Sequence, residues 1–151
     1  MVRTRQRYML CKLVHKSGNK FCVFGHTQNE VEEAVRNKIQ KMYGAYGAAI
    51  CREVTVKYLH AASGTVILRF APPGQRIVGG AVTNTSIGDF HFTICQVAGT
   101  GRTVTKKLIR MLKLDIIEAQ ALYSSADREK SEKSLSELIG KIESGESAIP
   151  Y

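Results

Sequence analysis

Three arginines, Arg3, Arg5 and Arg7, stand on alternate positions at the start of the chain, directly ahead of Tyr8 and an apolar run. Alternate side chains of an extended chain project to one side, so these guanidinium groups would form a row. Each guanidinium donates two parallel hydrogen bonds to phosphate oxygens, so the row suits a nucleic-acid backbone. The alternative is a solvated, frayed terminus.

A second set of basic residues repeats at helical spacing between residues 102 and 114. The cations are Arg102, Lys106, Lys107, Arg110 and Lys113. The opposing apolar side is formed by Val104, Leu108, Met111 and Leu112. No acidic residue interrupts this stretch, whereas helix faces that are only solvated usually mix both signs. We therefore expect this helix to contact phosphate.

A cation and an aromatic ring follow one another at Lys57 and Tyr58, near the end of a predicted strand. Together they predict phosphate contact and stacking on a base. An equally good interpretation is that Tyr58 is half-buried in the sheet.

The charge of the chain is uneven along its length. Residues 1–114 hold 18 Lys and Arg against 5 Asp and Glu, whereas residues 115–151 hold 4 against 8. A domain this basic favours a polyanionic partner such as nucleic acid. A membrane partner is not expected, because no apolar run approaches about 18 residues and the start of the chain has no signal-peptide pattern.

No catalytic or metal-binding set emerges from the sequence. The four histidines, His15, His26, His60 and His91, have no motif around them, and no phosphate-binding loop or nucleophile elbow is present. The turn at 99–101 could bind an anion through its amides, but it also serves as a plain strand-to-helix turn. We therefore expect no catalytic residue, no metal site and no cofactor held by this chain.

The four cysteines match no zinc pattern. Cys11, Cys51 and Cys95 fall inside predicted strands, where a free thiol behaves as a small buried hydrophobe. We expect them to be reduced core residues of an intracellular protein, with Cys22 unassigned.

Hydrophobic periodicity predicts an alternation of strands and helices. The expected strands are residues 8–16, 50–60, 65–70 and 90–97, and the expected helices are residues 30–43, 75–86 and 102–114. Asn29 and Glu32 would cap the first helix, and Gly44 would end it. Residues 116–122 can continue the last helix.

This order predicts an α+β, ferredoxin-like or RNA-recognition-motif-like two-layer sandwich, βαββαβ, with an added C-terminal helix. Two helices would cover one face of a four-stranded antiparallel sheet. The expected RNA-binding domain is 1–122. Residues 123–151 form a polar, acidic tail, either a surface helix or a segment that folds on a partner.

Five fragments of the chain, in order and at matching spacing, resemble one family. They are Arg7-Tyr8, residues 44–49 (GAYGAA), Val56-Lys57-Tyr58, residues 65–69 (TVILR) and Val97-Ala98-Gly99-Thr100. The family is the Pop-five protein subunit of archaeal and eukaryotic ribonuclease P, which in eukaryotes also belongs to ribonuclease MRP. The resemblance runs from Met1 to about Leu114.

The resemblance implies a non-catalytic protein that binds and stabilises a catalytic RNA beside other protein subunits. In that family, metal ions on the RNA, expected to be Mg²⁺, remove the 5′ leader of precursor tRNA. It also implies rRNA processing through the MRP RNA if the source is eukaryotic. The acidic tail and the opening Met-Val-Arg favour a eukaryotic member in the nucleus and nucleolus; an archaeal member would be cytoplasmic.

Two other functions are compatible with the same pattern. One is a different RNA-binding module, such as a ribosomal protein or a standard RNA-recognition motif; the latter needs two or three aromatic residues on its central strands, where residues 65–70 carry only Phe70. The other is a small ferredoxin-like hydrolase, for which no phosphate loop with a positioned Arg and Asn is found.

Overall fold

A computed structural model describes residues 5–18, 24–122, 136–137 and 139–141. Arg3 and Cys22 lie outside the described residues. Two units separate by their internal contacts, Met1–Thr100 and Gly101–Tyr151, and each is described by itself. The expected boundary at residue 122 stays a prediction.

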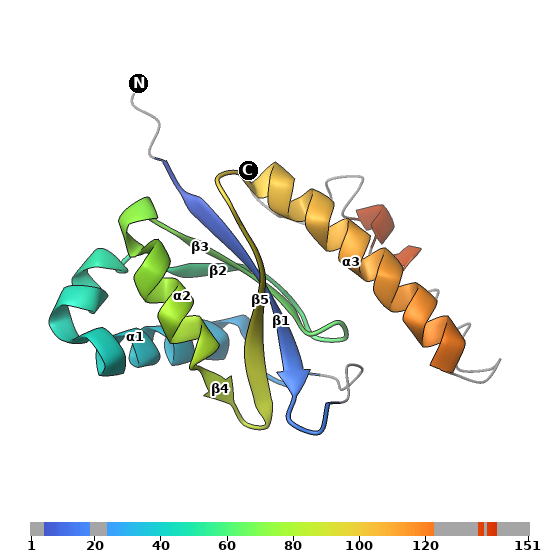
Figure 1. The fold of residues 1–151 in the computed structure, drawn as a ribbon, viewed down its shortest axis with the longest axis horizontal. Coiled ribbons are helices and arrows are strands. Elements are labelled where there is room, and N and C mark those ends of the chain that lie inside the picture. Colours follow the sequence, from blue (N-terminus) through green and yellow to red (C-terminus); the bar gives the residue numbers. More distant parts are fainter. Residues whose placement is uncertain (1–4, 19–23, 123–135, 138, 142–151) are drawn as a thin grey trace. The chain divides into compact units, whose positions relative to one another are not determined.

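The first unit is built on a five-stranded sheet in the order β2-β3-β1-β5-β4, in which every pair is antiparallel (Figure 1). The strands are β1 (Arg7–His15), β2 (Thr55–His60), β3 (Thr65–Phe70), β4 (Ser86–Ile87) and β5 (Phe90–Ala98). Without the two-residue β4, which was not predicted, this is the strand order of the ferredoxin-like fold. The predicted α+β fold class is confirmed.

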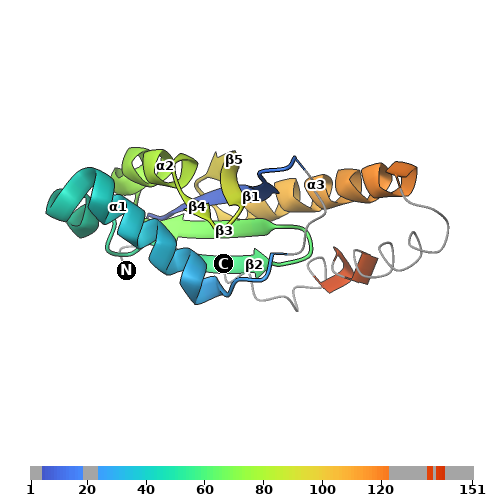
Figure 2. The same cartoon turned by 90° about the horizontal axis from the view of Figure 1, so that it is seen from below.

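Two helices, α1 (Gln28–Ile50) and α2 (Gln75–Thr83), cover one face of this sheet (Figure 2). Alternate residues of β1, namely Met9, Cys11 and Leu13, are buried on that face. The helices contribute Val31, Val35, Ile39, Val78, Ala81 and Val82 to the same core. Burying a large apolar side chain stabilises a fold by about 1.5–3 kcal/mol, so this shared core holds helices and sheet together.

The first helix begins two residues earlier than predicted. Thr27 is the N-cap, and Thr27 and Glu30 form the reciprocal capping box. The predicted pair of Asn29 and Glu32 is therefore wrong. The Glu32 carboxylate instead accepts a hydrogen bond from the Val56 N–H at 2.9 Å, which ties α1 to β2.

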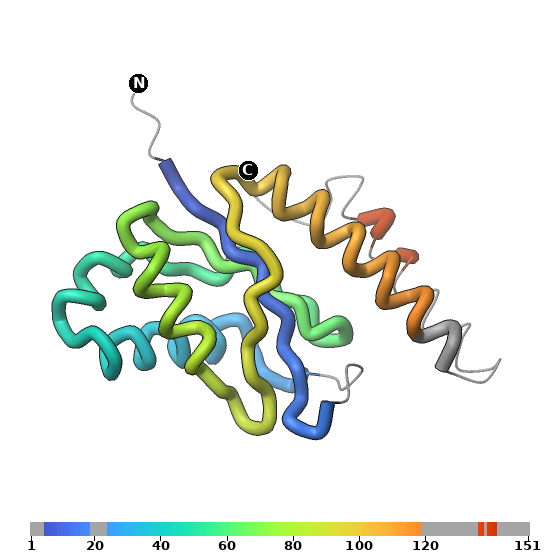
Figure 3. Tube along the Cα trace, viewed as in Figure 1, coloured from blue at the N-terminus to red at the C-terminus, as the bar shows by residue number. Residues whose placement is uncertain are grey.

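Gly44 interrupts α1 without ending it (Figure 3). Its φ of 60° and ψ of −155° lie in a region that is essentially restricted to glycine, and the chain then resumes a helix to Ile50. The predicted strand over 50–60 is consequently wrong in its first half, since β2 starts at Thr55.

The cysteines divide between strands and a connection. Cys51 lies in the connection after α1, not in a strand, and is buried there. Cys11 and Cys95 lie in β1 and β5 as predicted. Cys95 is only half-buried and is not a core residue, so that part of its prediction is wrong. The three described cysteines are free thiols.

The segment between β3 and β5 also departs from its prediction in detail. Pro72–Gly74 forms a short 3₁₀ helix, η1, where a simple break was expected. The helix that follows stops at Thr83, three residues before the predicted end, and Ser86 enters β4 instead.

The second unit contains α3 (Gly101–Leu122), which includes both the predicted helix and its extension. Val104, Leu108 and Leu112 are buried, as the apolar periodicity predicts. In the tail, residues 136–137 and 139–141 are helical. No helix in the described part of the chain is long and apolar enough to cross a membrane.

Candidate nucleic-acid interface

One basic surface is the α3 face, which we define as Arg102, Lys106, Lys107, Arg110 and Lys113. All five side chains are exposed, while the apolar residues between them, Val104, Leu108, Met111 and Leu112, are buried or half-buried. Five positive charges therefore lie within three turns of one helix, with no acidic residue between them. Such a helix can follow a row of phosphates by charge attraction and hydrogen bonding.

The N-terminal arginines begin the sheet. Arg7 is the first residue of β1 and pairs with Phe70 of β3, so it is anchored and not frayed. The end of β5 approaches its guanidinium closely: a Cβ at Gly99 would lie 2.6 Å from Arg7 Nη1. The position of Arg7 is thus set partly by the absence of a side chain at Gly99. Arg5 is exposed just ahead of the strand.

Two aromatic residues, Tyr8 and Tyr58, are among the predicted RNA-binding residues. Tyr8 lies in β1 and is buried, with 7% of its surface exposed. RNA contact through Tyr8 stays a prediction. Tyr58 is half-buried, as the second interpretation held, and burial raises its pKa to about 12. Lys57, also half-buried, lies where the β2–β3 register shifts.

Three further arginines come together with Arg5 and Arg7 only in the folded chain. Arg69 lies opposite Tyr8 of β1 and Thr55 of β2, at the same end of the sheet as Arg7. Arg52 precedes β2 at this end, and Arg76 follows β3 through η1. The connections that carry them meet, since the Cys51 thiol faces the Gly74 carbonyl at 4.0 Å.

We call this group the arginine end of the sheet: Arg5, Arg7, Arg52, Arg69 and Arg76. Arg5, Arg52 and Arg76 are exposed, and Arg7 and Arg69 are half-buried. Within the described ranges, none of the five belongs to an ion pair such as Lys16–Asp89, His26–Glu30 or Arg36–Glu32. Guanidinium groups without an ion-pair partner attract polyanions such as RNA.

Sequence spacing did not reveal Arg52, Arg69 and Arg76, because they stand 17 and 7 positions apart on different elements. One signal was available for Arg69 and Arg76, since no acidic residue occurs between Glu53 and Asp89. A basic segment of that length without an acid leaves its arginines without local partners.

Three histidines of the first unit bond to residues close to them in the sequence. His15 contacts Ser17, His26 contacts Glu30, and His60 accepts the Ser63 N–H at Nδ1. Burial raises the pKa of the Cys11 and Cys51 thiols, which disfavours the nucleophilic thiolate. Among the described residues, no three His, Cys, Asp or Glu side chains are grouped to hold a metal ion.

Comparison with known proteins assigns the chain to a family. A family model described as "Rpp14/Pop5 family" matches residues 7–109, which is more than half of the chain. The chain belongs to the Rpp14/Pop5 family. The resemblance found in the sequence fragments is thereby confirmed.

Several relatives of the Rpp14/Pop5 family cover almost the whole chain. "Ribonuclease P/MRP protein subunit POP5" of Homo sapiens is 31% identical over 160 residues, which span 98% of this chain and 97% of that protein. The protein of the same name from Mus musculus is 31% identical, spanning 90% of this chain and 85% of its own. A chain in "Cryo-EM structure of yeast Ribonuclease MRP" overlaps with a TM-score of 0.46 and 12% identity, over 76% of this chain and 96% of that one.

The Rpp14/Pop5 match includes most of both basic surfaces. Within residues 7–109 lie four members of the arginine end and the first three cations of the α3 face. Arg5, Arg110 and Lys113 fall outside the matched range. The basic surfaces therefore belong mainly to the family domain and not to the acidic tail.

Proposed function

We propose that this chain is a non-catalytic protein subunit of ribonuclease P and ribonuclease MRP that binds and stabilises the RNA of these particles. The near-full-length similarity to proteins named as ribonuclease P/MRP subunits carries the proposal. The two exposed basic surfaces supply the chemistry that such a role requires, because each neutralised phosphate adds to binding through counterion release.

The roles of the chain and of the RNA in the particle differ, because the chain contributes basic surfaces. Its cations bind and orient RNA. The RNA of the particle, with its Mg²⁺ ions, removes the 5′ leader from precursor tRNA and processes rRNA. Other ribonuclease P protein subunits complete the assembly. The chain would work in the nucleus and nucleolus, in keeping with its vertebrate relatives.

The proposal is tested with purified chain and precursor tRNA. The chain alone should leave the precursor intact, and cleavage should appear only when the ribonuclease P RNA and the remaining subunits are added. The chain should bind this RNA with an affinity that falls steeply with salt. Leader removal by the chain alone, or an affinity for the RNA that does not depend on salt, would contradict the proposal.

A further inference from the structure

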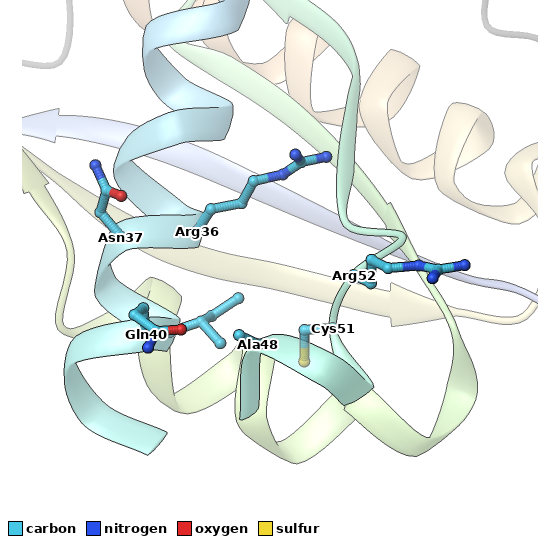
Figure 4. Close-up of a pocket in the computed structure, with 7 residues that line it drawn as sticks. Arg36, Asn37, Gln40, Ala48, Cys51 and Arg52 are labelled. Atoms are coloured by element: carbon cyan, nitrogen blue, oxygen red, sulfur yellow. The ribbon is translucent and has the colours of Figure 1, made fainter. Parts of the chain in front are cut away.

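The interruption of α1 at Gly44 creates a cleft in the first unit (Figure 4). It is lined by Arg36, Asn37, Ile39 and Gln40 from before the kink and by Ala48, Cys51 and Arg52 from after it. Its volume of about 310 Å³ lies at the lower end of the range for ligand sites, about 300–1,000 Å³. The cleft therefore has room for one small group and not for a peptide helix.

One side of the cleft is cationic. Arg36 Nη2 donates to the Val54 carbonyl at 2.9 Å and pairs with Glu32 Oε1 at 2.8 Å, so its guanidinium is held in place. Both contacts use the same nitrogen, and the N–H groups on Nε and Nη1 have no partner among the described residues. Arg52 is exposed and forms no ion pair in the described chain. In Figure 4 both side chains extend away from Asn37 and Gln40, and the two guanidinium groups do not point toward each other.

The other side of the cleft carries amides over an apolar floor. Asn37 and Gln40 are exposed and lie away from the two guanidinium groups (Figure 4). Ile39 and Cys51, which are 1% and 4% exposed, provide the floor together with Ala48. A side-chain amide presents a donor and an acceptor together, which is the pattern that reads the edge of a nucleobase.

We infer that this cleft binds one unpaired nucleotide of the RNA partner, with the phosphate on Arg36 and Arg52 and the base edge on Asn37 and Gln40. The inference rests on the proposed function, and it adds a base-reading site to the phosphate-binding surfaces. The two arginines are sufficient for contact with a phosphate. The amides of Asn37 and Gln40 and the apolar floor are the groups that would contact a base. RNA-binding proteins commonly take splayed-out bases from loops and bulges in this way. A carboxylate from a partner protein is the competing occupant.

The first test is cross-linking in the assembled particle. A photo-reactive phenylalanine derivative replaces Gln40 in tagged full-length chain, and the matched control carries it at Lys41, which is exposed but does not line the cleft. We expect position 40 to give an RNA adduct at a single unpaired nucleotide, in a yield about fivefold above that of position 41. An adduct to a protein subunit, or no adduct above the control, would overturn the inference.

Recovery of RNA with the tagged chain reports separately on the proposed function. If the tagged chain carries no ribonuclease P or MRP RNA, the proposed function and the inference both fail. If it carries the RNA but position 40 gives no RNA adduct, only the inference fails.

The second test measures base preference. The full chain is titrated against six-nucleotide A, C, G and U oligomers, with Asn37→Ala and Gln40→Ala combined in one variant and Lys41→Ala as the control. We expect the unmodified chain and the control to prefer one base by about fivefold or more, and the double variant to bind all four within about twofold. Unchanged preference in a double variant with an unchanged melting temperature, or no preference in the unmodified chain, would overturn the inference.

Discussion

The α3 face and the arginine end of the sheet are both basic, but they are assembled in different ways. The α3 face takes five exposed cations from twelve consecutive residues of one helix. The arginine end gathers residues between positions 5 and 76 from two strands, a loop and a helix, and two of its members are half-buried. The first depends on helical spacing alone, whereas the second exists only once the sheet has formed.

This difference predicts how each surface should respond to mutation. Exposed helix positions tolerate substitution, so changes on the α3 face should separate RNA binding from stability. At the arginine end, the positions of the side chains depend on the β1–β3 register, on the kink in α1 and on the close approach of Gly99 to Arg7. Substitutions there should therefore change both RNA binding and stability. Four experiments test that contrast, and their expected effects become progressively smaller.

Charge reversal of Arg102, Lys106 and Arg110 to Glu should reduce RNA affinity on the order of 100-fold at physiological salt, because it replaces three attractive charges by three repulsive ones. Each change should alter the free energy of unfolding by under about 0.5 kcal/mol, since the side chains are exposed. Electrophoretic mobility shift and thermal melting measure the two effects. Reversal of Lys130 and Lys133 in the acidic tail is the control, and a control that lost as much affinity would refute the assignment of this face.

Gly44→Ala should lower the free energy of unfolding by about 1–3 kcal/mol, because alanine is strained at this φ and ψ. The kink positions Arg52 and the cleft, so RNA affinity should also fall. Urea denaturation measures the stability, and Ala45→Gly, at an exposed helical neighbour, provides the comparison. If Gly44→Ala were as stable as the unmodified chain, the kink would not be a fixed feature of α1.

Replacement of Arg5, Arg69 and Arg76 by Ala should weaken RNA binding about tenfold and reduce the slope of log K against log salt by about 2, as expected for the loss of three phosphate contacts. A titration of affinity between low and physiological salt measures both quantities. An unchanged slope, with folding intact, would leave the α3 face as the surface that carries the electrostatic binding.

Lowering the pH should loosen the first unit slightly and leave α3 unaffected. Burial holds the pKa of His60 below its ordinary value of 6.5, and its Nδ1 accepts the Ser63 N–H only when that nitrogen is unprotonated. The unfolded chain therefore takes up the proton first, so the stabilisation present above pH 6.5 is lost as the pH falls below it.

His60→Gln removes this titration and is the matched variant. Amide hydrogen exchange at two pH values should show faster opening of the β2–β3 hairpin at low pH in the unmodified chain and a smaller change in His60→Gln. Equal acid sensitivity in both proteins would assign the effect to another group.

Local patterns in the sequence predicted a large share of the fold. The spacing of apolar residues predicted whether a segment is a strand or a helix, both in the core strands and in α1, α2 and α3. An element that is buried on one side carries apolar residues at the spacing of that element. The alternation of these elements was sufficient for the ferredoxin-like strand order, and the cations of α3 were found because one helix carries them all. The family, too, was recognisable from short fragments in order.

Other features depended on contacts between distant residues. The sequence predicted Asn29 and Glu32 as the cap of α1, whereas Thr27 is the cap and Glu32 bonds to Val56 of β2. Gly44 reads as a helix end, yet its backbone conformation lets the helix resume and form the cleft.

The arginine end depends on strand order and register. Arg69 lies at the same end of the sheet as Arg7 because β3 pairs antiparallel with β1, which places Arg7 opposite Phe70 and Arg69 opposite Tyr8. The spacing of residues along the chain shows which side chains are neighbours within one helix or strand. Neighbours on different strands depend on strand pairing, which cannot be seen in local spacing. The family, the fold class and the α3 face could therefore be predicted from the order of the amino acids, whereas the arginine end and the cleft required the folded chain.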